Sequence, residues 1–210
     1  AVLADAPLFV LGCGDYAYAN RDGRFATVGQ AVDAWFRQYE PVISRHPFMT
    51  QYGNHETRLI ERFEDWAPRL AHPEGFQHSR CYAFDVGAAH LAGMFLVDAP
   101  PSAEELAWLD ADLRRARAQG RAWVIVFQHE PVYGFGRSHP SKPGLVRDLI
   151  PILERHGADL VLSGHDQNYE RTYPLSGPPE GPRVMSDSLE TYAAGEGVLY
   201  CKVSPAGKQS

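Results

Sequence analysis

The stretch Val161 to Arg171 reads VLSGHDQNYER, and it indicates how the rest of the chain is organised. A short apolar run ends in Gly164-His165, and polar residues follow immediately. This pattern is typical of a buried strand that delivers an imidazole to the edge of a sheet. Gln167 comes two residues later. The stretch therefore predicts that His165 lies at a strand end, in a position suited to a functional site.

Three other stretches repeat this arrangement of an apolar run followed at once by polar residues. The runs cover residues 7–12, 46–51 and 122–128, and the polar residues behind them include Asp15, Asn54 and His129. Open α/β sheets hold their ligands at the carboxyl ends of their strands. We therefore expect the four strand ends to meet, with Tyr18 and His55 close by.

Each of these residues alone has a simple structural explanation. An Asp after a strand commonly caps the next helix, and an Asn in a turn tolerates unusual backbone angles. Recurrence at four strand ends favours a shared site instead. A carboxylate oxygen, an amide oxygen and imidazole nitrogens together suit divalent and trivalent metals. The sequence thus predicts a metal site that includes Asp15, Asn54, His129 and His165.

The remaining sequence predicts an α/β fold in one domain that covers residues 1–210. A helix is expected over residues 27–43, stopped by Pro41, and another between Ser102, which has capping-box spacing to Glu105, and Gly120. A further helix is expected to end at residues 156–157. Residues 80–86 and 90–98 flank a Gly-Ala-Ala turn and predict a hairpin.

Two further expectations concern the C-terminal part and the histidines outside the strand ends. Residues 174–182 contain four prolines and two glycines, which predicts an irregular loop. Residues 198–203 alternate in polarity and predict a final strand at an edge of the sheet. The histidines in polar or proline-rich segments are expected to be exposed, and they are His46, His72 and His78.

Composition limits the classes of partner. The 210 residues include 20 basic and 26 acidic side chains, with a formal charge of −6 and no basic tract. This disfavours a nucleic acid or an anionic membrane as a partner, while small anionic substrates stay compatible because a bound metal changes the local charge. No apolar run approaches the ~18 residues that span a bilayer. The cysteines, Cys13, Cys81 and Cys201, are far apart; they lack the spacing of a zinc site, and one disulfide pair remains open.

Taken in order, the motifs resemble those of a known family. Gly14-Asp15-x-x-Tyr18, the turn 53–56 (GNHE), a strand followed by His129, and Gly164-His165 are together similar to the calcineurin-like metallophosphoesterases. The tyrosine that ends the first motif, Tyr18, and the residues 169–171 (YER) resemble the purple acid phosphatase branch. The resemblance extends from Asp15 to Arg171, which is most of the chain.

The resemblance implies a four-layer α/β/β/α sandwich with its site at the C-terminal ends of the strands. It also implies a metal-dependent phosphoesterase that hydrolyses phosphate monoesters by attack of a metal-bound hydroxide, with no covalent intermediate. Two metals are implied, a ferric iron and a divalent Zn, Fe or Mn. The implied substrate is a small phosphorylated molecule, and the implied location is secreted or periplasmic.

The same resemblance implies a role for each site residue. Asp15 would bridge the two metals, and Tyr18 would bind the ferric iron. The divalent metal would be held by Asn54, His129 and His165. The two catalytic histidines would be His55, in contact with the phosphate, and His139, in position to protonate the leaving group.

Two departures from the family pattern affect the ferric site. The family motif Gly-His-x-His has Gln167 in place of its second histidine, and a glutamine can coordinate only through its neutral amide oxygen. The family also has an Asp on an earlier strand, and this sequence begins too late to contain it. Two alternatives therefore stand beside the phosphomonoesterase: a degenerate relative that binds one metal or phosphate, and a phosphodiesterase of the same fold.

Overall fold

The computed structural model describes residues 2–19, 23–57, 62–77, 80–136 and 139–204, which contain both helices and strands. The strands are β1 Val10–Gly12, β2 Phe48–Thr50, β3 Tyr82–Val86, β4 Ala89–Gly93, β5 Trp123–Phe127, β6 Leu160–Ser163, β7 Tyr169–Arg171, β8 Leu175–Ser176, β9 Arg183–Val184 and β10 Leu199–Val203. The helices are α1 Val2–Asp5, α2 Val28–Ile43, α3 Asn54–Thr57, α4 Phe63–Trp66, α5 Ala103–Ala118, α6 Pro143–Val146 and α7 Ile150–Arg155, with a 3₁₀ turn at Ala67–Arg69.

Two sheets carry the strand ends of interest. The parallel strands β1 and β2 form a small sheet, and six strands in the order β3-β4-β5-β6-β10-β7 form a large one. In the large sheet β4, β5, β6 and β10 are parallel to one another, whereas β3 and β7 run antiparallel at the two edges. Parallel pairing brings the carboxyl ends of neighbouring strands to one edge of each sheet, as the strand-end pattern requires.

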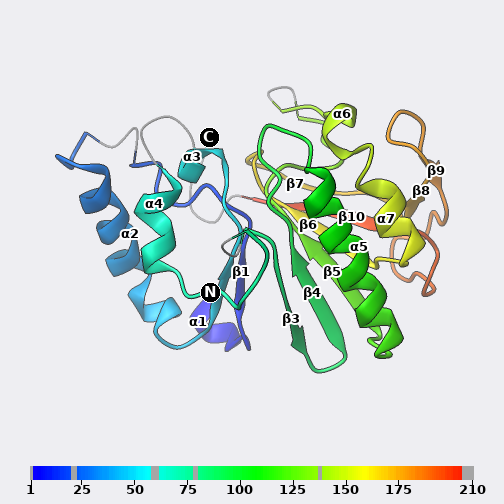
Figure 1. Cartoon of the computed structure of the whole chain (residues 1–210), viewed down its shortest axis with the longest axis horizontal. Coiled ribbons are helices and arrows are strands. Elements are labelled where there is room, and N and C mark those ends of the chain that lie inside the picture. The colour runs from blue at the N-terminus through cyan, green and yellow to red at the C-terminus, as the bar shows by residue number, and fades with distance from the viewer. Residues whose placement is uncertain (1, 20–22, 58–61, 78–79, 137–138, 205–210) are drawn as a thin grey trace.

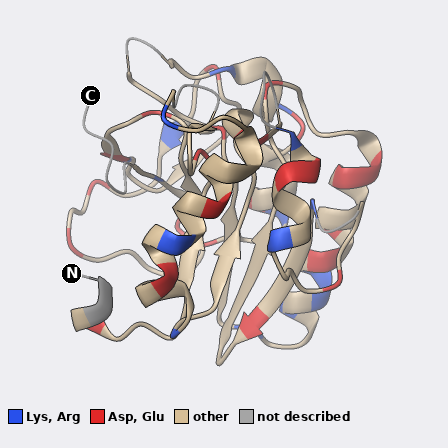
Figure 2. Cartoon of the chain, turned by 90° about the vertical axis from the view of Figure 1, so that its left-hand side faces the viewer, with Lys and Arg blue, Asp and Glu red and all other residues tan. Residues whose placement is uncertain are grey.

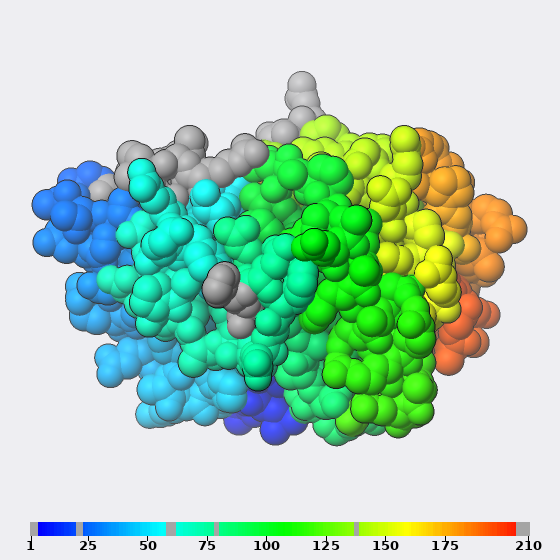
Figure 3. Space-filling model, viewed as in Figure 1, coloured from blue at the N-terminus to red at the C-terminus, as the bar shows by residue number. Residues whose placement is uncertain are grey.

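Three separate apolar cores divide the molecule into four layers. Figure 1 shows α2 and α4 on one side of the two sheets and α5 and α7 on the other, and Figure 3 shows the same order across the surface, from blue at α2 to yellow at α7. The first core, which includes Trp35 and Trp66, joins α2 and α4 to the small sheet. The second, which includes Leu11 and Phe127, joins the two sheets. The third, which includes Leu113 and Val126, joins the large sheet to α5 and α7. The four-layer α/β/β/α sandwich is confirmed.

Strand β5 illustrates why a buried strand reads as a continuous apolar run. Its side chains alternate between two cores: Val124 and Val126 pack toward α5 and α7, while Ile125 and Phe127 pack toward the small sheet. Since both faces are covered, neither set can be polar. The chain leaves the sheet after Phe127, and His129 follows at its carboxyl end.

Helix α5 has the predicted caps. Ser102 accepts a hydrogen bond from the backbone N–H of Glu105, and the Glu105 carboxylate accepts the N–H of Ser102 at 2.7 Å. At its end, Gly120 has a φ of +75°, and Gly120 and Arg121 donate their N–H groups to Arg117 and Ala116. These bonds satisfy carbonyl groups that the helix end would leave unpaired.

Two predictions about element ends are wrong. Helix α2 continues through Pro41 to Ile43, because a proline in the last turn removes one backbone donor while the N–H of Ser44 still bonds to Glu40 at 3.0 Å. Strand β10 is an internal strand and not an edge strand, since β6 and β7 pair with its two sides. Its alternation arises because the polar Lys202 lies on a buried face.

Smaller differences concern the other predicted segments. The hairpin forms as β3 and β4, but its second strand ends at Gly93. The helix expected before residues 156–157 is split into α6 and α7, and the irregular loop contains the short strand β8. The three cysteines are free thiols.

The expected exposure of the outlying histidines is also wrong where it can be judged. His46 and His72 are partly buried, and His78 lies outside the described residues. The His72 ring stacks on Tyr82 and bonds to the hydroxyl of Thr50. Burial lowers the pKa of His72 to about 4, so the ring is neutral.

The surface charge of the described part is mixed. On the face seen in Figure 2, acidic and basic residues are interspersed along the helices. Within the described ranges every helix is too short or too polar to cross a bilayer.

Candidate metal centre

The two sheets meet where β1 and β5 end. The ring Nδ1 of His129 lies 2.6 Å from the backbone oxygen of Cys13, which follows β1. A carbonyl oxygen only accepts hydrogen bonds, so His129 must carry its proton on Nδ1. Its Nε2 therefore presents a lone pair to the space between the sheets, and that is the form in which imidazole binds a metal.

Two other acceptor atoms lie close to that lone pair and form a triangle with Nε2. The Nε2 of His129 lies 3.0 Å from Oδ1 of Asn54 and 2.9 Å from Nδ1 of His165. The Nδ1 of His165 lies 3.1 Å from the same Asn54 oxygen. The residues come from the starts of the segments after β2, β5 and β6, as the sequence predicted. A triangle of acceptor atoms at such distances is held together by a shared cation or proton.

Asp15 lies next to this triangle, and its two carboxylate oxygens face different residues. Its Oδ1 lies 3.5 Å from Nε2 of His129 and accepts the backbone N–H of His55 at 3.1 Å. Its Oδ2 accepts the hydroxyl of Tyr18 at 3.4 Å. Ligand atoms of Asp15, His129 and His165 all lie within 4.8 Å of one another. Asp15 thus separates an Asn–His–His side of the site from a tyrosine side.

Gln167 lies on the tyrosine side. Its Nε2 donates a hydrogen bond to the Tyr18 hydroxyl at 3.1 Å. Burial, and then the neighbouring Asp15, raise the pKa of Tyr18 to about 12. The phenol therefore keeps its proton unless a cation is bound close to it.

The two predicted catalytic histidines reach opposite sides of the cluster. The ring of His55 lies against the ring of Tyr18, with centroids 3.9 Å apart. The ring of His139 lies 4.1 Å from that of His165. The structure thus brings all eight residues of the predicted site together: Asp15, Tyr18, Asn54, His55, His129, His139, His165 and Gln167. Their chemical roles stay predictions.

The backbone around the site is tightly constrained. A side chain at Gly14 would collide with the backbone of Gly53, and one at Gly53 would collide with the carboxylate of Asp15. Asp15, Tyr18 and His165 have φ angles of 62°, 49° and 67°, in the left-handed region that such residues rarely adopt. Strain of this kind persists where the surrounding structure enforces it, and it gathers at functional sites.

Sequence reasoning assigned no role to Glu56, which the structure makes a central support. Its side chain is fully buried, and its carboxylate accepts the backbone N–H groups of Asp15 at 2.7 Å, Tyr16 at 2.8 Å and Gly53 at 2.9 Å. Burial and the nearby Asp15 raise the pKa of Glu56 to about 8, against these three hydrogen bonds. Glu56 fixes the loop after β1 to the loop after β2. Its position next to Asn54-His55 was the available signal.

A buried lysine behind the site was also missed. Lys202 on β10 has a side chain only 1% exposed, and it pairs with Asp166 at 2.9 Å and Glu170 at 3.0 Å. Glu170 in turn accepts the backbone N–H of Phe135, in the loop that carries His139. A lysine in a strand otherwise suggests solvent, so the sequence held no signal for this pairing.

The donor set fits a metal ion. The lone pair of His129, the amide oxygen of Asn54 and the carboxylate of Asp15 face one space in a largely buried setting. Burial, and then the neighbouring His129, lower the pKa of His165 to about 4, so this ring is neutral and able to coordinate. Oxygen and imidazole ligands in this mixture suit Zn, Fe or Mn.

This combination of layered fold and strand-end donors is that of a metallophosphoesterase. The chain belongs to the calcineurin-like phosphoesterase family, whose model matches residues 2–169.

Curated relatives place purple acid phosphatases among its homologues. Human acid phosphatase type 7 is 32% identical over 191 residues, an alignment that covers 79% of this chain and 41% of that protein. Purple acid phosphatase 22 of Arabidopsis thaliana is 31% identical over 192 residues, covering 85% of this chain and 42% of that protein. The chain thus spans less than half the length of these relatives.

Solved structures show the same fold. The purple acid phosphatase PPD1 from yellow lupin seeds superposes with a TM-score of 0.83 at 21% identity, over 95% of this chain and 37% of that one. GAP50, described as the anchor in the inner membrane complex of Plasmodium, matches with a TM-score of 0.54 at 19% identity, over 95% of this chain and 62% of that one. A fold shared with an anchor protein does not by itself decide activity.

Proposed function

We propose that this chain is a metal-dependent phosphoesterase that hydrolyses small phosphate monoesters. The observation that carries the proposal is the convergence of three acceptor atoms, from Asn54, His129 and His165, with Asp15 beside them. Family membership supports the same chemistry. Only a cation or a proton can hold such acceptors together, and a bound metal also attracts phosphate.

We propose the following roles for the residues that hold the metals. Asn54, His129 and His165 would hold the divalent metal, with Asp15 shared between it and a ferric iron bound by Tyr18. The bound metals would supply Lewis acidity at the phosphate and an activated water as nucleophile.

The two remaining histidines would act on the substrate. His55, which packs on Tyr18, would contact the phosphate. His139, which packs on His165, would give a proton to the leaving-group oxygen.

The second metal is the finer part of the proposal. The placement of Asp15 supports it, because one carboxylate oxygen faces His129 and the other faces Tyr18. Gln167 opposes it, since the amide donates to Tyr18 and supplies no imidazole nitrogen. A single-metal relative is therefore the competing hypothesis, and metal content distinguishes the two.

The proposal extends to the size of the substrate and to the location of the protein. A small phosphorylated substrate is favoured over a nucleic acid by the net charge of −6. A phosphodiester substrate would need the same donors, so parallel assays on aryl phosphate monoesters and diesters decide between them. Export of the protein follows from the family resemblance alone.

The test combines metal analysis with turnover. We expect two metal ions per chain by elemental analysis, together with hydrolysis of an aryl phosphate at acidic pH. The variant His165→Ala should lose the divalent metal and the activity. His46→Ala is the matched control, because His46 is also partly buried but lies outside the cluster. One metal with no turnover supports the single-metal relative, and metal retained in His165→Ala would refute the ligand assignment.

A further inference from the structure

The ring nitrogen of His165 that points away from the triangle lies in an unusual environment. Its Nδ1 faces Asn54 and His129, so the opposite nitrogen, Nε2, points into the protein. That Nε2 is buried and has no hydrogen-bond partner within the described ranges. Oε2 of Glu130 lies 4.0 Å from this nitrogen. A buried polar nitrogen without a hydrogen-bond partner costs free energy. The neighbouring carboxylate of Glu130 therefore influences which ring nitrogen of His165 carries the proton.

Glu130 is held rigidly in that position. Its side chain is 2% exposed, and Oε1 accepts the backbone N–H of Asp98 at 3.1 Å. Lys142 donates to both carboxylate oxygens, at 3.0 and 2.9 Å. The backbone of Glu130 is anchored as well, by its N–H to Leu96 and its carbonyl to Gln128. Oε2, which accepts from Lys142, keeps acceptor capacity toward His165.

From this geometry we infer that Glu130 positions His165 as a metal ligand, because its carboxylate charge, 4.0 Å from Nε2, favours the proton on that nitrogen. The inference rests on the proposed metal centre. When Nδ1 binds a metal, the single proton of the neutral ring must lie on Nε2. A carboxylate facing that proton stabilises this tautomer, orients the ring and makes Nδ1 a better donor. The backbone N–H of Asp98 and the ammonium of Lys142 both stabilise the carboxylate, which does not face the proposed metal itself.

A glutamine at position 130 would reverse this effect. The backbone N–H of Asp98 and the ammonium of Lys142 would attract the amide oxygen to the Oε1 position. The NH₂ group would then take the place of Oε2 and face Nε2 of His165. A donor facing a donor disfavours the tautomer that coordinates through Nδ1, although the volume of the side chain is unchanged.

The experiment measures zinc affinity with a chromophoric chelator as competitor, for the native chain, Glu130→Gln and Lys142→Met. We expect Glu130→Gln to weaken zinc binding about 10- to 100-fold, the usual effect of losing such an outer carboxylate. Lys142→Met keeps the carboxylate and should change the affinity less than threefold. If Glu130 merely anchors the loop through Lys142, both variants should weaken binding alike, and that result would overturn the inference.

A second readout addresses the tautomer directly. In zinc-loaded protein labelled with ¹⁵N-histidine, the NMR spectrum should show His165 protonated at Nε2, with a proton signal that moves upfield in Glu130→Gln. Protonation at Nδ1 would contradict the inference. Thermal unfolding of the metal-free variants shows whether each one folds. Failure of the native chain to bind zinc would defeat the proposed function instead, so the two failures are distinguishable.

Discussion

Gln167 donates its amide N–H to Tyr18, and this contact decides how the tyrosine side of the site behaves. The amide satisfies the phenol oxygen while that oxygen keeps its proton. A metal on this side would need the phenolate, and the amide brings no nitrogen ligand to assist. The Asn–His–His side, by contrast, has its donors already turned toward one another.

The variant Gln167→His should strengthen the tyrosine side. An imidazole adds a nitrogen ligand in place of a neutral amide, and we expect iron occupancy to rise at least tenfold in limiting iron. The measurement is iron content together with the visible phenolate-to-iron absorption band. A control in the background Tyr18→Phe should bind iron without the band. Unchanged iron content would show that Gln167 does not limit the site.

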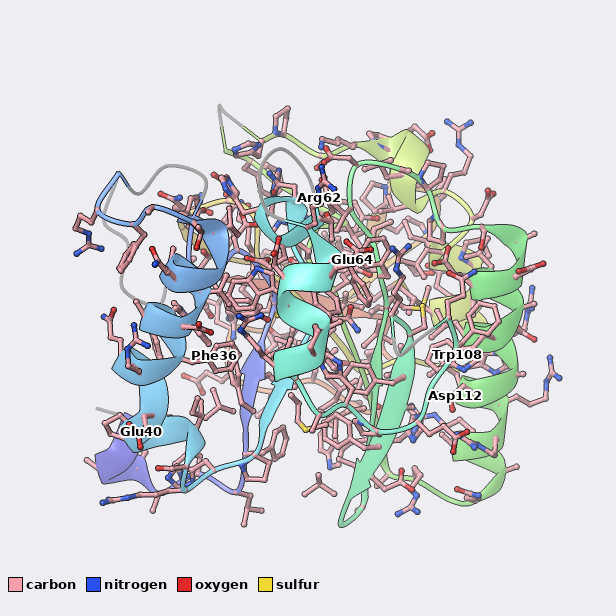
Figure 4. The ribbon with its side chains drawn as sticks, turned by 60° about the vertical axis from the view of Figure 1, so that its left-hand side comes forward. Phe36, Glu40, Arg62, Glu64, Trp108 and Asp112 are labelled. Atoms are coloured by element: carbon pink, nitrogen blue, oxygen red, sulfur yellow. The ribbon has the colours of Figure 1, made fainter. Side chains whose placement is uncertain are left out.

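At the level of elements, helix α5 is defined by its caps and by the face it buries. Figure 4 shows Trp108 and Asp112 one turn apart on the side of α5 that faces the sheet. Trp108 packs against the core between the large sheet and α5 and α7, and Asp112 bonds to His90 of β4. The sequence predicted the caps because they depend on residues only a few positions apart. It did not predict the buried aspartate, whose partner lies 22 positions away.

Removing the N-cap of α5 tests that local contribution. Ser102→Ala should lower the free energy of unfolding by about 1 kcal/mol, because the N–H of Glu105 loses its partner. Ser102→Asp is the matched control and should retain most of the stability, since aspartate caps equally well. Urea unfolding followed by circular dichroism gives both values. Equal loss in the two variants would show that the serine acts through packing.

His90 links β3, β4 and α5 through a charged cluster. The ring is 3% exposed, and its nitrogens lie 2.8 Å from Asp85 and 2.7 Å from Asp112. Arg121 pairs with Asp85, and Arg115 pairs with Asp112. Burial lowers the pKa of His90, but the carboxylates of Asp112 and Asp85 outweigh it, so the net shift is upward from 6.5.

This upward shift has a defined consequence for stability. A group whose pKa is higher in the folded state contributes fully below its unfolded value and loses that contribution as the pH rises through the folded value. His90→Gln should therefore cost about 2–3 kcal/mol below pH 6.5 and progressively less at higher pH. Urea unfolding of both proteins between pH 5.5 and 9 measures the difference. A difference independent of pH would mean that His90 is not the charged partner.

At the scale of the whole molecule, the site lies where the two sheets meet. Cys13 and Asn54 follow strands of the small sheet, whereas His129 and His165 follow strands of the large one. The proposed metal ligands come from both sheets, and a bound metal would join layers that are otherwise held together by apolar packing. Metal binding should therefore stabilise the entire fold and not the loops alone.

Zinc should raise the midpoint of thermal unfolding. At free zinc 100-fold above the dissociation constant, linkage adds about 2.7 kcal/mol, which corresponds to about 5–10 °C for a chain of this size. A chelator should reverse the shift in differential scanning calorimetry. His165→Ala should show little shift, because its ligand set is incomplete. An equal shift in that variant would indicate zinc binding elsewhere on the chain.

The sequence by itself determined the four strands that end at the site, the caps of α5, the family and the set of residues that meet at the site. These follow from periodicity, short-range spacing and the polar residue after each buried strand, all of which are local. The tertiary structure alone decided how the site is supported. Glu56 bonds to Asp15, 41 positions away in the sequence, and Lys202 bonds to Asp166, 36 positions away. Lys202 can lie on β10 inside the sheet because Asp166 and Glu170 pair with its charge. Such pairings depend on contacts that only folding creates, since burial of a charge is stable only beside its partner.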